Sequence, residues 1–500
     1  MAIAAYVISM VIVTLTACRM PSSEQPDLDT SDLASIPEIA YELDPKKVSQ
    51  TWEGWGTSLA WWANVVGDTE YASEWADLFF TDKELDFLGK KTPGLKLNIV
   101  RYNIGGTGRP GDTTERLEKN PLASPEYRDR WYAAIEGYWK NWSDPSPESD
   151  SWDWNRDRAQ RRILQLAISR GATRVEFFSN SPMWWMKDSK SAAGGTLQPW
   201  NRGDFATYLA TVVDHAQSHW GIPVASLSPF NEPSAGWWTY PKNQEGANID
   251  GETRQAVIDL LRKELQKRNI ETSIAGADEN TIAHVDETHV YDRLNVHSYV
   301  GTDPNRDNRA RKQLRESIQN KKLWSSEFGD GDASGAALAR TILDDVLHLR
   351  PNAWIYWQAV EPHQNPWGLA NGVFGQSPVA PNRGRPTALP NKYFVFAHFT
   401  RFISDDMQIL SQEDESAIVA YSKTRRILAV VASNLTDSDR MVAWNLRPFE
   451  FDDDVTFDVY RTTFDGRVQY RNESLTIAAG LLRLPIQRQS IASISIQMPP

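Results

Sequence analysis

The chain has 500 residues and carries 65 acidic against 53 basic side chains, which gives a formal net charge of −12. This acidic balance argues against nucleic acids and anionic membranes as partners. The length exceeds what one simple hydrophobic core usually holds, so we expect one large domain and one smaller domain.

Residues 1–20 are predicted to be a signal peptide, because residues 2–15 are apolar but too few to span a bilayer. The single cysteine, Cys18, ends a Leu-Thr-Ala-Cys sequence that resembles the box of bacterial lipoproteins. Residues 21–38 are rich in Ser, Pro and Asp and are expected to form a disordered leader. We therefore expect a secreted protein, with a lipid anchor at the cell surface through Cys18 as the alternative.

Residues 53–404 alternate short β-rich runs with amphipathic helical stretches. This alternation implies parallel strands joined by right-handed crossovers. Eight such units over about 350 residues predict a (β/α)8 barrel of the TIM type. A doubly wound open sheet is the alternative, but no glycine-rich phosphate loop follows an early strand. The eight runs are residues 57–62, 95–106, 173–185, 224–233, 272–280, 293–300, 322–331 and 353–360.

The pattern changes after residue 404. Residues 405–500 contain five alternating β-type runs separated by turn residues, without helical periodicity. This pattern predicts an antiparallel β-sandwich as a side domain. Residues 39–52, ahead of the first barrel strand, are also strand-like and are expected to join that sandwich.

Two glutamates follow predicted barrel strands. Glu232 closes the fourth strand and Glu327 closes the seventh. Catalytic residues of such barrels lie at the carboxyl ends of the strands, and strands four and seven face each other across the barrel mouth. Two carboxylates that flank one bond are what glycosidic hydrolysis requires. Asp278 and Glu279, which end the fifth strand, are the best rival acids; the other rivals are Glu176, Asp330, Asp332 and Glu361.

The motifs around these glutamates resemble a known family. Asn231-Glu232-Pro233 after strand four, with a glutamate ending strand seven, resembles the clan A retaining glycosidases. A wider set of motifs resembles glycoside hydrolase family 30, and the sequence GWGTSLAWWA at 54–63 is most similar to its endo-β-1,6-galactanase branch. That wider set is GWGTS at 54–58, RYNIGG at 101–106, SPMWW at 181–185 and SEFG at 326–329.

The resemblance covers nearly the whole chain from about residue 40 and implies a barrel with a side β-sandwich built from both ends of the chain. It also implies a retaining endo-glycosidase that hydrolyses internal β-1,6-galactosyl bonds of arabinogalactan-type galactan. In that mechanism Glu327 is the nucleophile and Glu232 the acid/base.

The same resemblance implies roles for further residues. Asn231 would bond the sugar 2-hydroxyl. Arg101, counted with the substrate-binding residues, would lie near Glu327 and keep that carboxylate ionised. His297 and Tyr299 end the sixth strand, and the tyrosine would bond the nucleophile.

Aromatic and amide side chains complete the expected site. The chain has 21 tryptophans, and flat indole faces pack well on the C–H faces of sugar rings. Trp184 and Trp357 are expected to be sugar platforms, and Asn103 is a candidate partner for sugar hydroxyls. Asn180 and Gln358 are further hydroxyl candidates, and Trp61, Trp62, Trp237 and Trp238 are candidates for outer subsites.

No cofactor or metal is expected. The sequence has no His-Glu-X-X-His motif, no cysteine pair and no Gly-X-Ser-X-Gly nucleophile elbow. The expected partner is a polysaccharide, with no obligate protein partner, and the protein is expected to act as a monomer. Alternatives with the same chemistry are a β-1,6-glucanase, a xylanase or a glucosylceramidase-like hydrolase. An alternative of another class is a carbohydrate-binding barrel without catalysis.

Overall fold

The computed structural model describes residues 38–109, 112, 130–242, 244–285, 289–299, 308–451, 455–477 and 480–498. The predicted signal peptide (1–20) and the predicted leader, apart from residue 38, lie outside these ranges. Every helix in the described part of the chain is too short or too polar for a bilayer span.

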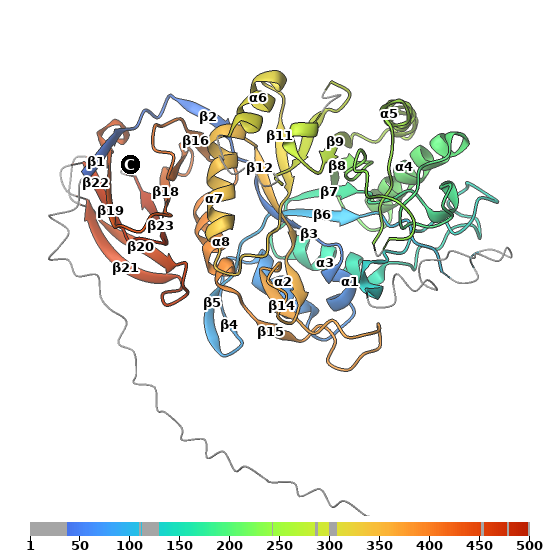
Figure 1. The fold of residues 1–500 in the computed structure, drawn as a ribbon, viewed down its shortest axis with the longest axis horizontal. Helices are drawn as coiled ribbons and strands as arrows, with labels where there is room; N and C mark the ends of the chain where they lie inside the picture. The colour runs from blue at the N-terminus through green and yellow to red at the C-terminus, as the bar shows by residue number, and fades with distance from the viewer. Residues whose placement is uncertain are drawn as a thin grey trace, which may run out of the picture.

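Eight parallel strands close into a barrel, which confirms the predicted fold and excludes the open sheet. Around the barrel the strands follow chain order, β3-β6-β7-β8-β9-β10-β11-β12, and β12 pairs back with β3. Figure 1 shows the barrel as the larger part of the molecule. The strands are β3 (Gly54–Ser58), β6 (Ile99–Asn103), β7 (Arg174–Phe178), β8 (Val224–Ser228), β9 (Ser273–Glu279), β10 (Arg293–His297), β11 (Leu323–Glu327) and β12 (Ala353–Gln358).

Several predicted strand boundaries differ from the observed ones. The first strand was expected at 57–62, but β3 begins at Gly54 and ends at Ser58, and Trp62 opens helix α1 (Trp62–Val66). The third strand ends at Phe178, and residues Trp184–Met186 form a short 3-10 turn, η5. Buried apolar runs look alike in strands and helices, so periodicity alone could not separate them.

Helices surround the barrel with their apolar faces turned inward. In α3 the buried side chains include Ile163, Leu164 and Ala167, spaced three to four residues apart, which places them on one face. Helix α5 begins after Asp250, whose carboxylate accepts a hydrogen bond from the Thr253 N–H at 2.8 Å. The helices are α2 (Ala72–Phe80), α3 (Arg158–Ser169), α4 (Arg202–Ser218), α5 (Gly251–Lys267), α6 (Arg309–Ile318), α7 (Ala336–Asp344) and α8 (Asn391–Phe402).

Short elements complete the barrel part. The π-helical turn η8 (Asp345–Leu349) continues α7. The remaining 3-10 turns are η4 (Trp131–Ala133), η6 (Pro199–Asn201), η7 (Ile282–His284) and, in the side domain, η9 (Arg447–Phe449). The small strands are β4 (Glu84–Phe87), β5 (Lys90–Pro93), β13 (Val360–Pro362), β14 (Ala370–Gly372) and β15 (Pro386–Ala388).

The side domain consists of two sheets around a second apolar core. A seven-stranded sheet has the order β2-β16-β17-β18-β23-β20-β21, and a three-stranded sheet has the order β1-β19-β22. Val430, Trp444 and Leu484 are fully buried in this core. All of the pairings are antiparallel except that of β1 with β19, which is parallel. The strands are β1 (Glu38–Glu42), β2 (Val48–Thr51), β16 (Gln408–Leu410), β17 (Ala417–Ser422), β18 (Ile427–Asn434), β19 (Arg440–Asn445), β20 (Val455–Thr463), β21 (Arg471–Ile477), β22 (Leu481–Ile486) and β23 (Ser490–Gln497).

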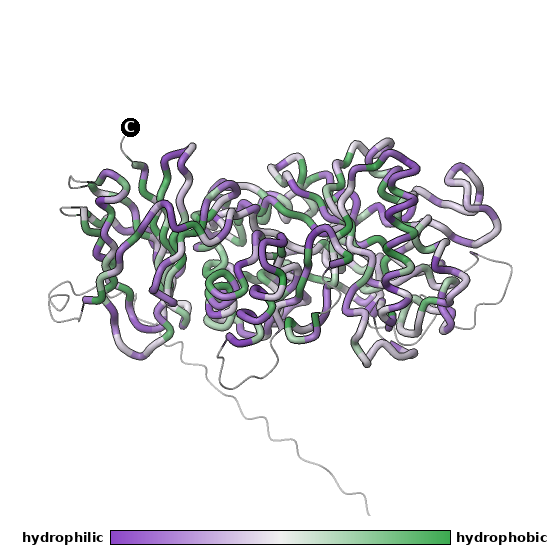
Figure 2. The backbone as a smooth tube through the Cα atoms, turned by 90° about the horizontal axis from the view of Figure 1, so that it is seen from above, coloured by the Kyte–Doolittle hydropathy of each residue, from purple (hydrophilic) through white to green (hydrophobic). Residues whose placement is uncertain are grey.

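Helix α8 joins the two parts by packing against β18, β20 and β23 (Figure 1). On this helix the buried His398 bonds Ser493 Oγ at 2.7 Å through Nδ1 and Thr462 Oγ1 at 2.8 Å through Nε2. Figure 2 shows the two parts from above, with polar and apolar stretches alternating along the chain in both. The side domain therefore rests against the barrel wall and leaves the carboxyl ends of the barrel strands to the site.

Candidate active site

Glu232 lies in an unusual backbone conformation just beyond strand β8. Its φ is 48°, in the left-handed region that residues with a Cβ seldom adopt. Its N–H donates to the Asp278 carbonyl at 2.8 Å, and its own carbonyl accepts from Trp238 Nε1 at 3.0 Å. Pro233 fixes the next φ and thereby stiffens the turn. Backbone strain of this kind persists only where the surrounding structure holds it in place, and strained residues are often found at functional sites.

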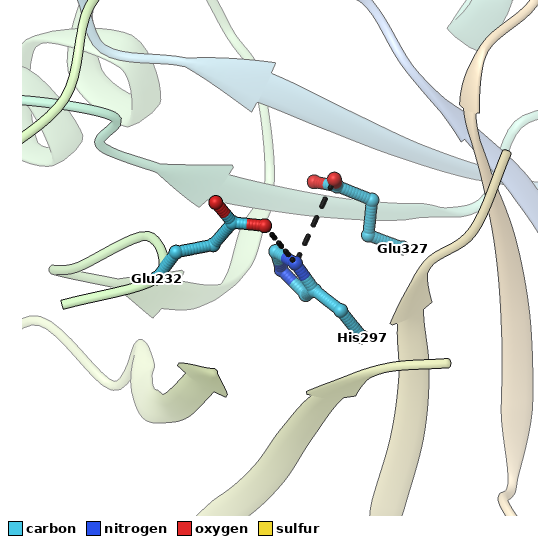
Figure 3. A group of neighbouring side chains, drawn as sticks. All are labelled: Glu232, His297 and Glu327. Carbon is cyan, nitrogen blue, oxygen red and sulfur yellow. Dashed lines mark hydrogen bonds and ion pairs between the residues drawn. The ribbon is translucent and has the colours of Figure 1, made fainter. Parts of the chain in front are cut away.

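Glu232 and Glu327 face each other at the mouth of the barrel. A carboxylate oxygen from each and a ring nitrogen of His297 all lie within 4.8 Å of one another. Figure 3 shows both carboxyl groups directed at the imidazole between them. Separations of about 5–5.5 Å are typical of retaining glycosidases, and about 6.5–9.5 Å of inverting ones. The observed approach therefore matches the retaining geometry.

His297 lies beneath both carboxylates. Its Nδ1 is 3.2 Å from Glu232 Oε1 and 3.6 Å from Glu327 Oε1, and its Nε2 is 3.3 Å from Asp278 Oδ1. Burial alone would lower the pKa of His297, but the three surrounding carboxylates outweigh it and raise the pKa to about 10. At neutral pH the ring is therefore a cation with an N–H on each nitrogen.

Burial raises the pKa of Glu327 to about 7, and the charge of Glu232 adds to this rise, while His297 and Arg101 oppose it. Tyr299 donates its hydroxyl to Glu327 Oε1 at 3.2 Å, and its own pKa is raised well above the ordinary value. Arg101 therefore favours the ionised form of Glu327, as expected, but burial outweighs this effect and leaves the pKa of the carboxyl near neutrality.

Arg101 is fully buried below the cavity. It donates from Nε to Glu176 Oε1 at 2.8 Å, from Nη2 to Asp278 Oδ1 at 3.1 Å and from Nη1 to the Ser326 carbonyl at 3.0 Å. Burial favours the neutral form of Asp278, but Arg101 and His297 outweigh it and hold the pKa of that carboxyl below its ordinary value. The expectation that Arg101 contacts the sugar is therefore wrong, because its guanidinium is buried and pairs with Glu176 and Asp278 beneath the site.

The other rival acid, Glu279, is also committed to internal partners. Arg254 Nη1 donates to Glu279 Oε1 at 2.5 Å, and Ser234 Oγ donates to Oε2 at 2.6 Å. These bonds secure the chain directly after Pro233. Both acids of the fifth strand therefore hold the structure around the site.

The two glutamates line a cavity of about 700 Å³. Of the residues expected to bind sugar, Asn231, Tyr299 and Trp357 line it too. The buried Oδ1 atoms of Asn180 and Asn231 accept no hydrogen bond from any described residue. These acceptors and the cavity volume suit a hydroxyl-rich ligand, since buried polar atoms normally have partners.

Besides Arg101, three expected sugar contacts lie outside this cavity lining. Asn103 is buried, with Nδ2 donating to Glu245 Oε2 at 3.0 Å and Oδ1 accepting from the Asn180 N–H at 3.2 Å. Trp184 is 1% exposed and packs so closely over Gly108 that a Cβ there would lie 2.3 Å from its indole nitrogen. His297 is fully buried and reaches the site only through the glutamates. Sequence position at a strand end identified these residues but could not give their depth.

Of the tryptophans expected at outer subsites, one lines the cavity and three do not. Trp61 lines the cavity, whereas Trp62 is fully buried and its Nε1 donates to the Ser58 carbonyl at 2.8 Å. Trp237 and Trp238 are not part of the cavity lining, and Trp238 instead supports the Glu232 carbonyl. Gln358 is 1% exposed, and its Oε1 accepts from the Trp61 N–H at 3.0 Å.

Sequence reasoning missed several residues of the cavity wall. Asn280 donates from Nδ2 to Glu232 Oε1 at 2.7 Å, and its place at the end of the predicted fifth strand was a usable signal. Asn365 and Trp367 come from the segment after β13. No strand-end rule or motif marks them.

The Glu232, His297 and Glu327 cluster has the spacing of a cation site within the described residues. A protonated His297, which the surrounding carboxylates favour, supplies positive charge at the same place. The arrangement suits acid–base and nucleophilic chemistry by two carboxyl groups.

Comparisons with known proteins agree with this geometry. Residues 38–296 match the family model described as O-Glycosyl hydrolase family 30. An endo-beta-1,6-galactanase from Hypocrea rufa is 37% identical over 413 residues, which are 79% of this chain and 81% of that protein. An exo-beta-1,6-galactobiohydrolase from Bifidobacterium longum subsp. longum is 24% identical, over 86% of this chain and 37% of that longer protein. The crystal structure of a conserved exported protein from Bacteroides fragilis has a TM-score of 0.73 at 20% identity, covering 92% of this chain and 100% of that one.

Proposed function

This chain belongs to O-glycosyl hydrolase family 30, and from that membership we propose that it is a retaining endo-glycosidase of β-1,6-galactan. Its substrates are the internal β-1,6-galactosyl bonds of arabinogalactan-type chains. The choice of galactan rests on the 37% identity to the Hypocrea rufa endo-beta-1,6-galactanase. The observation that carries the chemistry is the approach of the Glu232 and Glu327 carboxylates to within 4.8 Å in one cavity.

The proposed mechanism is a double displacement. Glu327 attacks the anomeric carbon while Glu232 donates its proton to the departing exocyclic oxygen, which leaves as the hydroxyl of the released chain. Glu232, now a carboxylate, takes a proton from water. That water attacks the anomeric carbon of the glycosyl-enzyme, Glu327 departs as a carboxylate, and the product keeps the β configuration.

The surrounding residues support these two roles. The His297 cation stabilises negative charge on whichever glutamate is ionised, and the Tyr299 hydroxyl holds the Glu327 oxygen that does not need to attack. The second oxygen, Glu327 Oε2, has no partner among the described residues, so it is the atom we assign to the attack. Asn280 holds Glu232 Oε1 from the other side.

Sugar binding is assigned to the cavity lining. Asn231 is placed beside Glu232 to bond a hydroxyl of the sugar at the cleaved bond, a contact that strengthens in the transition state. Trp357 and Trp61 meet nearly at right angles, with ring centroids 5.3 Å apart, and give the cavity an aromatic corner. A β-1,6 linkage adds a rotatable bond per sugar, and rigid aromatic walls offset part of the entropy lost on binding.

The test is product analysis with two polymers. The protein is incubated with de-arabinosylated arabinogalactan and, separately, with the β-1,6-glucan pustulan. We expect faster hydrolysis of the galactan, release of short oligosaccharides from the first minutes, and new ends that form initially as β-anomers by NMR. Faster hydrolysis of pustulan would overturn the galactan assignment, and initial α-anomers would overturn the retaining mechanism.

We also propose that the protein acts as a secreted monomer. A polymeric substrate supports action outside the cell, and the apolar stretch within residues 1–20 supports export. Cell fractionation with mass spectrometry of the mature N-terminus checks the first point and separates free protein from protein acylated at Cys18. Light scattering of the purified protein checks the second.

A further inference from the structure

Glu361 is a third carboxylate in the wall of the cavity that holds Glu232 and Glu327. It lies in β13, on the segment that follows barrel strand β12, and is 8% exposed. Burial raises the pKa of Glu361 to about 7, and Gln358, Arg130 and Lys392 oppose this rise only in part. The mechanism above gives this carboxylate no task.

The nearby cations are engaged elsewhere. Lys392 donates from Nζ to Asp330 Oδ1 at 2.9 Å, and the Arg130 guanidinium lies over the Trp61 ring at 4.5 Å from its centroid. A carboxylate buried without an ion pair is costly unless hydrogen bonds compensate for the lost water. Hydrogen-bond donors in the cavity would therefore stabilise the ionised form of Glu361.

Two protein side chains orient the carboxylate. Asn365 Nδ2 donates to Glu361 Oε2 at 2.9 Å, and hydrogen bonding by the Gln358 side chain also favours the ionised form of Glu361. An ionised carboxylate offers about four lone-pair sites, so these bonds leave accepting capacity for a ligand. A buried, oriented acceptor in a cleft, with a pKa perturbed by burial, is a candidate binding group.

The walls beside Glu361 are aromatic. Trp357 and Trp61 form the corner already described, and Trp367, which is 44% exposed, lines the same cavity. Trp367 lies against the chain after β11, since a Cβ added to Gly329 would come within 3.2 Å of its ring. Flat apolar faces next to an acceptor match a sugar ring, which has an apolar C–H face and an edge of hydroxyl donors.

We propose that Glu361 is a substrate-binding residue whose carboxylate accepts hydrogen bonds from the hydroxyls of a hexosyl unit held by the tryptophan walls. Asn365 acts as a positioning residue for that carboxylate. This inference rests on the proposed function, because it takes the cavity to be a glycoside site, and it adds a residue that decides how tightly the sugar is held.

The test measures sugar affinity without turnover. In the Glu327→Gln background, calorimetry gives the Kd of β-1,6-galactotriose and of β-1,6-glucotriose, and the more tightly bound trisaccharide is then used throughout. Adding Glu361→Gln should weaken its binding by about tenfold or more, the size of one hydrogen bond to a charged group. Adding Asn365→Ala should weaken it less. The control is Glu413→Gln, which removes an exposed carboxylate between β16 and β17 and should leave Kd within about twofold.

The outcomes separate this inference from the proposed function. Preference of the native protein for pustulan removes the galactan assignment, yet the Glu361 test then proceeds with glucotriose. An unchanged Kd in the Glu361→Gln protein overturns the inference even if galactan is the substrate. So does a fall in melting temperature without a change in Kd, because that result marks a purely structural carboxylate. Failure of the Glu327→Gln protein to bind either trisaccharide overturns both.

Discussion

At the scale of single residues, two glutamates with similar burial are separated by their neighbours. Glu327 has a hydroxyl donor and one oxygen without a partner among the described residues, whereas Glu232 has two donors on one oxygen, His297 and Asn280. A nucleophile needs an open oxygen, and an acid/base needs to be held while its proton comes and goes. The hydrogen bonds therefore support the same division of roles as the sequence motif.

Replacement of either glutamate should give a distinct chemical signature. Glu327→Ala should abolish hydrolysis of every substrate, because no covalent intermediate can form. Glu232→Ala should lose about 10²–10⁴-fold on natural linkages and much less on aryl galactosides, whose leaving groups need no proton. Azide should rescue Glu232→Ala and give the β-galactosyl azide by NMR. A β-azide from Glu327→Ala and an α-azide from Glu232→Ala would reverse the two roles.

Removing the His297 charge should move the pH profile upward. As a cation, His297 favours the ionised form of Glu327, so its loss should raise the pKa of that carboxyl. The nucleophile must be ionised to attack, so kcat/KM of the native protein should rise as the pH increases through the Glu327 pKa of about 7. In His297→Gln this rising limb should shift to higher pH, together with a lower maximum. A limb that stays in place would show that the imidazole does not act on Glu327.

At the scale of elements, the alternation of strands and helices predicted the barrel, and the strand-end rule led to Glu232 and Glu327. The same rule placed Trp184 and Arg101 at the mouth, but the structure has both buried outside the cavity lining. A position near a strand end predicts the height of a side chain along the barrel only roughly. Arg101 lies lower because it pairs with the buried carboxylates of Glu176 and Asp278. Asn365 and Trp367 were not predicted because loop conformation, which the sequence pattern does not encode, brings them to the wall.

Helix α5 offers a prediction about stability alone. The Asp250 carboxylate caps this helix by accepting from the Thr253 N–H at 2.8 Å and from the Thr253 hydroxyl at 3.0 Å. Asp250→Ala should lower the free energy of unfolding by about 1 kcal/mol, the usual effect of losing such a cap. Denaturant unfolding measures this loss, and kcat/KM should stay unchanged. Asp250→Asn, which keeps an accepting oxygen, should retain most of the stability and serves as the matched control.

At the scale of the whole molecule, the barrel and side domain share helix α8 and the buried His398. Burial is the main cause that lowers the pKa of His398 to about 3, so the folded protein holds the ring neutral between two hydroxyl groups. In the unfolded chain the pKa returns to about 6.5. The unfolded state therefore binds an extra proton below about pH 6.5, and the stability that the neutral ring contributes is lost progressively as the pH falls from there towards 3.

His398→Gln should remove this part of the pH dependence. Glutamine keeps a donor and an acceptor for Thr462 and Ser493 but does not titrate. Calorimetry at pH 7 and pH 5 should show a smaller drop in melting temperature for the variant than for the native protein, even if the variant is less stable at pH 7. The comparison between variants is needed because carboxylates also titrate in this range.

His215 provides the matched control, because it is partly buried in the barrel part and its pKa is lowered to about 4. His215→Gln should also reduce the drop in melting temperature between pH 7 and pH 5, but it leaves the α8 junction intact. Equal drops in the native and His398→Gln proteins would show that the junction does not depend on the neutral ring.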